Sequence, residues 1–286
     1  MGNGATDTGG ARLSDLLGVD DPTDYGAARR AIVRVTAQLI DLLIGLDRTD
    51  AAIPGLEWTV AGTAAHLVKG FRAFAAAVEG RLDGWGTPAA DAVLSSLAEI
   101  PDQHDPRTVA RQLGHAVDAF LSASADRSPD DRFPTPWYTV DRTNCVGPMT
   151  CLLLGELVIH GVDISAGAGR PWPIDADDAR RIITGVFPVK IPVLVNPDTT
   201  KGLKARVELA VDGGPTLVVQ FSDGTATVEP ANTGPVDCHV GGDPTAVLLL
   251  AYGRAASDEL FTQGRLRAWG TDPALGVKFK SYMKNP

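Results

Sequence analysis

The sequence predicts a two-domain protein in which an all-α, up-down four-helix bundle is followed by a smaller α+β domain with an antiparallel sheet. Through most of residues 25–166, apolar side chains recur at three- and four-residue spacing, which is typical of helices that pack in a bundle. After about residue 203 the period becomes two and glycine-containing turns separate the apolar runs, which indicates β-hairpins. The 286 residues are enough for two domains of ordinary size.

The bundle is expected to contain four main helices and one shorter helix. Thr59 can cap the second helix, because a threonine hydroxyl accepts a hydrogen bond from a backbone N–H of the first turn. The segment 128–142 holds three prolines and is expected to form a long crossover loop. The expected helices cover residues 25–46, 59–79, 89–99, 106–125 and 148–166.

The second domain is expected to follow a proline-containing linker. A short helix over residues 176–186 should give way to extended chain, because prolines follow at positions 188, 192 and 197. The expected strands cover residues 206–211, 216–221, 225–229, 236–240 and 266–269, with helices near 244–252 and 273–283. The chain therefore divides into a loose N-terminal leader (1–22), the bundle (23–175), a linker with a short helix (176–202) and the α+β domain (203–286).

Composition and charge exclude several classes of function. The hydrophobic fraction of 44% and charged fraction of 21% are those of a soluble globular protein, and the net charge of −9 disfavours nucleic acid as a partner. The leader lacks the apolar core of a signal peptide, and we expect no membrane span, because no run of about eighteen apolar residues was found. Cys145, Cys151 and Cys238 show no CxxC pairing and are expected to be reduced thiols. We therefore expect a cytoplasmic monomer or small homo-oligomer.

A glutamate and a histidine four residues apart, Glu156 and His160, lie in the apolar surroundings of the fourth helix. On a helix this spacing places both side chains on one face, and a histidine from a second helix, His66, can complete a zinc site of the His2Glu type. Asp163 lies three residues after His160, where it can accept the second N–H of the imidazole or cap the helix end. Two simpler interpretations remain open at this point: a Glu156–His160 hydrogen bond that lines the bundle, or a solvated polar face.

These residues resemble the metal-binding pattern of the DinB-like bundle superfamily, and within it the mycothiol-dependent maleylpyruvate isomerase group. The likeness rests on residues 58–60, 65–67 and 155–163. It implies a zinc ion, or another divalent metal, held by His66, Glu156 and His160, with water or substrate completing the coordination. The C-terminal domain resembles the sterol-carrier-like domain found in the same group, on the segments 237–244, 252–254 and 266–270.

The resemblance implies a metal-dependent enzyme whose low-molecular-weight thiol, mycothiol, is held as a zinc thiolate for S-transfer to, or isomerisation of, a small electrophile. The family uses a C-terminal arginine in catalysis, and Arg254 is the candidate, with Arg265 and Arg267 as rivals and a surface role as the simpler interpretation. The alternative is a small-molecule or lipid-binding protein that acts through its C-terminal domain, with a non-catalytic bundle. His239 is expected to be structural, and the electrophile, the thiol and the metal are not specified by any motif.

Overall fold

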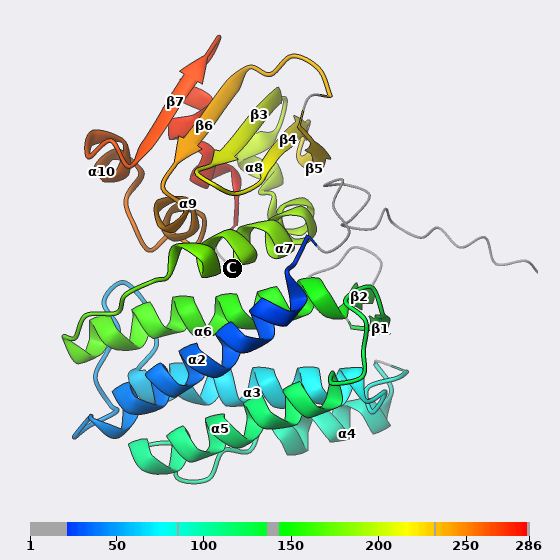
Figure 1. Cartoon of the computed structure of the whole chain (residues 1–286), viewed down its shortest axis with the longest axis vertical. Coiled ribbons are helices and arrows are strands. Elements are labelled where there is room, and N and C mark those ends of the chain that lie inside the picture. Colours follow the sequence, from blue (N-terminus) through cyan, green and yellow to red (C-terminus); the bar gives the residue numbers. More distant parts are fainter. Residues whose placement is uncertain (1–21, 85, 136–142, 232, 285–286) are drawn as a thin grey trace, which may run out of the picture.

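The molecule is built in layers: a helical bundle, a long helix beside it, and a five-stranded sheet (Figure 1). The computed structural model describes residues 22–84, 86–135, 143–231 and 233–284. Within these residues, the expected helical domain followed by an α+β domain is confirmed.

Four helices close a ring around the N-terminal core. Both α2 (Tyr25–Ile44) and α3 (Val60–Val78) contact α5 (Pro106–Ala123) and α6 (Val146–Ala168), while the shorter α4 (Pro88–Leu97) packs on α3. In the expected crossover segment, a short strand β1 (Arg132–Pro134) pairs with β2 (Thr143–Cys145), and residues 136–142 lie outside the described residues. The apolar stripes read from the sequence form this core, where Phe71 and Phe120 meet edge to face.

Helix α6 is apolar around most of its circumference because other elements cover it on several sides. It contacts α2, α3 and α7, and 72% of its most apolar stretch is buried. Its length and composition would suffice to cross a membrane, so the expectation that the sequence holds no such stretch is wrong. Such extensive burial within the protein is typical of a helix at the centre of a protein core.

Helix α7 (Ala176–Leu194) is longer than expected and replaces most of the predicted linker. The expectation that this helix ends near residue 186 is wrong, because the helix continues through Pro188 and Pro192. An interior proline removes a backbone hydrogen bond and costs about 3 kcal/mol in a helix. Here the helix buries Val186, Phe187 and Ile191, and this burial offsets the loss.

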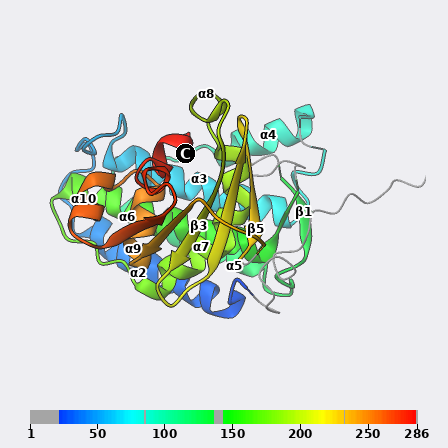
Figure 2. The same cartoon turned by 90° about the horizontal axis from the view of Figure 1, so that it is seen from above.

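The C-terminal sheet has the strand order β5-β4-β3-β6-β7. All neighbouring pairs are antiparallel except β3 and β6, which are parallel, so the sheet is mixed rather than purely antiparallel. Seen from above, the strands β3 to β5 lie over α7, which separates them from the bundle (Figure 2). The strands are β3 (Lys204–Val211), β4 (Thr216–Ser222), β5 (Thr225–Pro230), β6 (Cys238–Gly242) and β7 (Leu266–Gly270); the helices are α8 (Pro197–Thr200), α9 (Pro244–Ala251), α10 (Ser257–Thr262), α11 (Ala274–Val277) and the 3-10 helix η1 (Phe279–Tyr282).

Candidate metal centre

Helices α3 and α6 bring His66, Glu156 and His160 to one point. Thr59 caps α3 by accepting a hydrogen bond from the backbone N–H of Gly62, as expected, and this fixes the start of the helix that carries His66. Glu156 Oε2 lies 3.4 Å from His66 Nε2 and 3.2 Å from His160 Nε2. One donor atom from each of the three side chains lies within 4.8 Å of the others.

This spacing fits a tetrahedral metal ion. With metal–ligand bonds of about 2.1 Å, neighbouring ligand atoms of a tetrahedral zinc ion lie roughly 3.4 Å apart. The two distances from Glu156 Oε2 match that value, and the donor set of two imidazoles and one carboxylate is one that zinc accepts. The residues present therefore fit the metal that the sequence pattern predicts.

Asp163 orients His160 from the Nδ1 side of the imidazole, opposite the nitrogen that faces Glu156. Its Oδ2 atom lies 2.9 Å from His160 Nδ1, and because a carboxylate only accepts, Nδ1 carries a proton, while Nε2 faces Glu156 and His66. Burial alone would lower the pKa of His160, but the hydrogen bonds with Asp163 and Glu156 outweigh it and raise that pKa to about 9. Burial would raise the pKa of Glu156, yet hydrogen bonds from both histidines and the charge of Lys190 hold it well below its ordinary value. The triad therefore stabilises a negatively charged glutamate.

Arg254, which follows α9 in the C-terminal domain, completes this chain of contacts. Its Nε and Nη2 atoms each donate to a different oxygen of Asp163 at 2.8 Å, and Nη1 donates to the backbone carbonyl of Tyr252 at 2.7 Å. Burial would raise the pKa of Asp163, but the hydrogen bonds from Arg254 and His160 lower it. The rival candidates lie elsewhere: Arg265 pairs with Asp243, and Arg267 is exposed on β7.

Two residues at the site, Trp58 and Lys190, were given no role of their own in the sequence analysis. Trp58, 42% exposed, places its ring 5.0 Å from the ring of His66 and stacks on His160 at 5.9 Å. Lys190 is buried on α7, with its Nζ 3.8 Å from Glu156 Oε1. Val186 and Lys190 are four residues apart and therefore lie on the same buried face of α7. Because the prolines predicted a helix end near residue 186, Lys190 was not expected on that face.

A small apolar pocket of about 40 Å³ adjoins the triad. It is lined by His66, Glu156, Leu67, Gly70, Phe71, Phe74 and Leu153. The His66 side chain is 38% exposed, whereas those of Glu156 and His160 are 15% and 12% exposed. Solvent and small molecules therefore have their most direct approach to the triad on the His66 side.

The cysteines and the remaining candidate histidine lie apart from these contacts. None of the three cysteines, all of which are described, forms a disulfide, and Cys151 packs on α7 where Gly185 leaves room for it. His239 pairs with Glu208 at 2.7 Å and stacks on Trp269 within the sheet. These contacts agree with the structural role expected for His239.

The comparisons with known proteins match the two halves of the chain separately. The family model described as the mycothiol maleylpyruvate isomerase N-terminal domain matches residues 32–165, and that of the SCP-2 sterol transfer family matches residues 194–284. No curated protein matches the chain.

Two solved structures illustrate the likeness. The mycothiol-dependent maleylpyruvate isomerase is 16% identical with a TM-score of 0.49, over 81% of this chain and 90% of that one. Sterol carrier protein 2 from Yarrowia lipolytica is 20% identical with a TM-score of 0.26, over 31% of this chain and 73% of that one. Residues 32–165 are therefore similar to the mycothiol maleylpyruvate isomerase N-terminal domain, and residues 194–284 are similar to the SCP-2 sterol transfer family.

Proposed function

We propose that this protein is a metal-dependent enzyme that uses a low-molecular-weight thiol, mycothiol, for S-transfer to a small electrophile or for its isomerisation. The observation that carries the proposal is the convergence of His66 Nε2, Glu156 Oε2 and His160 Nε2 at distances suited to zinc. The family of the N-terminal domain supports a thiol cosubstrate and an isomerase-like reaction. The absence of disulfides supports a reducing, cytoplasmic compartment.

A zinc ion bound by three protein ligands keeps one position open and lowers the pKa of a thiol that occupies it. The protein's own groups prepare this site. Asp163 accepts the Nδ1–H of His160, so Nε2 is the nitrogen that would bind the metal once its proton is lost, and Glu156 supplies a negative charge. The ring of Trp58 packs beside both imidazoles, tilted against that of His66 and stacked on that of His160. The thiol and the electrophile then meet on the more exposed side, next to the apolar pocket at His66.

Arg254 acts on this site through Asp163 in our proposal. Each of its three guanidinium nitrogens already donates a hydrogen bond within the protein, and its side chain is only 17% exposed. A bidentate grip on a substrate carboxylate would require it to release Asp163. We therefore assign Arg254 a positioning role instead of the direct substrate contact expected from the sequence.

Metal content and turnover test the proposal together. The purified protein should hold close to one zinc ion per chain, and His66→Ala or His160→Ala should remove both the metal and thiol-dependent turnover of a panel of activated alkenes, epoxides and halides. His239→Ala is the matched control, because that histidine binds Glu208 and not the triad. Full turnover in a metal-free His160→Ala variant would contradict the proposal.

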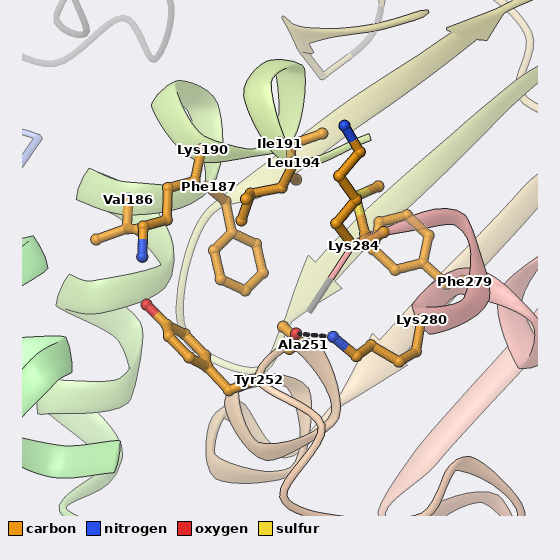
Figure 3. Close-up of a pocket in the computed structure, with 11 residues that line it drawn as sticks. Val186, Phe187, Lys190, Ile191, Leu194, Ala251, Tyr252, Phe279, Lys280 and Lys284 are labelled. Carbon is orange, nitrogen blue, oxygen red and sulfur yellow. Dashed lines mark hydrogen bonds between the residues drawn. The ribbon is translucent and has the colours of Figure 1, made fainter. Parts of the chain in front are cut away.

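A second candidate function is that of a carrier, and one specific observation favours it. An apolar pocket lies between α7, α9 and η1, with Phe187, Leu194 and Phe279 among its walls (Figure 3). Its volume of about 40 Å³ has room for two or three water-sized groups. A sterol or long acyl chain would fit only if the helices moved apart. Binding of a fluorescent fatty acid to metal-free protein, abolished by Leu194→Trp, would support the carrier function.

A further inference from the structure

Lys190 approaches the proposed metal centre from α7, whereas the three proposed ligands lie on α3 and α6. It lies on α7, beyond Pro188, and its side chain is 6% exposed. Burial lowers its pKa, while the charge of Glu156 acts in the opposite direction. A buried lysine is unfavourable unless it has partners, so its position next to a metal ligand calls for a role.

The two oxygens of Glu156 face different groups. Oε2 faces the two imidazole nitrogens at 3.4 and 3.2 Å, whereas Oε1 lies 3.8 Å from Lys190 Nζ. A carboxylate can bind a metal through one oxygen or through both. An ammonium group at Oε1 attracts that oxygen and repels a cation that approaches it.

A second contact holds the ammonium group in place. Lys190 Nζ lies over the ring of Tyr252, 5.5 Å from its centroid, which is a cation–π distance. Figure 3 shows the lysine amine and the tyrosine hydroxyl pointing toward each other. Tyr252 precedes Arg254 by two residues, and its carbonyl accepts a bond from that arginine. The C-terminal domain therefore supports the lysine as well as Asp163.

We propose that Lys190 is a positioning residue that limits Glu156 to coordination through Oε2 and so keeps one position on the metal open. This inference rests on the proposed metal site. It predicts that replacing Lys190 changes the coordination number of the metal. An ion pair that only stabilises the fold would leave the coordination number unchanged.

Cobalt(II) is the probe, because four-coordinate cobalt absorbs visible light more strongly than five-coordinate cobalt. Lys190→Met should reduce the absorption of the cobalt-loaded protein, as Oε1 becomes a further ligand. It should also strengthen zinc binding in competition with a chelator, because a positive charge is removed from the site and a ligand is gained. Lys190→Arg should keep the wild-type spectrum, since a guanidinium places a positive charge beside the same oxygen. Lys280→Met is the matched control: this lysine lines the same pocket but donates to the carbonyl of Ala251.

The outcomes separate this inference from the proposed function. If the wild-type protein binds neither cobalt nor zinc, the proposed function fails. If it binds both, and Lys190→Met leaves the spectrum and the zinc affinity unchanged while lowering only the stability, the inference is wrong. Should Lys190→Met not fold, Lys190→Gln replaces it as the neutral variant, with the same spectral change expected and the same result contradicting it.

Discussion

Arg254 holds Asp163 by two hydrogen bonds of 2.8 Å, although the two residues are 91 positions apart and belong to different domains. Asp163 in turn accepts a hydrogen bond from Nδ1 of His160, so the electrostatics of the proposed metal centre depend on a residue of the C-terminal domain. The Asp163 side chain is 4% exposed and carries its negative charge in the interior, where an unpaired charge is unfavourable.

Arg254→Met should therefore destabilise the protein by roughly 3 kcal/mol, because it leaves a buried carboxylate with one partner fewer. Chemical unfolding measures the change. Arg265→Met is the control, since its partner Asp243 is 37% exposed and such a pair contributes about 1 kcal/mol or less. Equal losses in the two variants would contradict the importance assigned to the Asp163–Arg254 pair.

Zinc should stabilise the folded protein by an amount that grows with the logarithm of its concentration above the Kd. A ligand that binds only the folded state adds about 2.7 kcal/mol to the free energy of unfolding at a hundredfold excess over its Kd. Thermal unfolding of chelator-treated protein, with and without added zinc, shows the effect. Glu156→Gln should lose most of the gain, whereas His239→Ala should keep it; an equal gain in both variants would place the metal elsewhere.

Gly161 follows the proposed ligand His160 directly, and Trp172 packs against its backbone. A Cβ atom at this position would lie 2.2 Å from two ring atoms of Trp172, so Gly161→Ala should displace the indole and cost about 1–3 kcal/mol. Gly70→Ala in α3 is the control, because a Cβ atom there meets nothing within 4 Å. Alanine is the better helix former, so this variant should gain about 0.5–1 kcal/mol. Chemical unfolding of both variants measures the two changes in the free energy of unfolding. A Gly161→Ala variant as stable as the wild type would contradict the close packing against Trp172.

Asp243 caps α9 and should make stability depend on pH. Burial would raise its pKa, but hydrogen bonds from Arg265 and Thr245 outweigh it and lower that pKa. A lowered carboxyl pKa stabilises the folded state above the ordinary value near 4, and this contribution disappears as the pH falls from about 5 to about 2. Asp243→Asn keeps a capping oxygen and removes the charge, so its stability should fall less steeply in that range, by up to about 1 kcal/mol. A curve parallel to that of the wild type would contradict the assignment.

The sequence predicted that His66, Glu156 and His160 lie together, because most of the proposed site is local. Glu156, His160 and Asp163 lie on one helix, whose geometry fixes their relative positions, so a single helix pairing suffices to add His66. Lys190 escaped prediction because burial overrides the helix-breaking tendency of two prolines. The choice of Arg254 over Arg265 and Arg267 depends on how the two domains pack, which no local pattern encodes.

Helix α7 has a consequence for how the molecule responds to heat. It packs on α6 on one side and on α9 and β5 on the other, and buried apolar residues of both domains belong to one continuous core. A shared helix leaves no hinge between the two folds. We therefore expect a single cooperative melting transition in calorimetry, in which the sheet and the bundle are lost together.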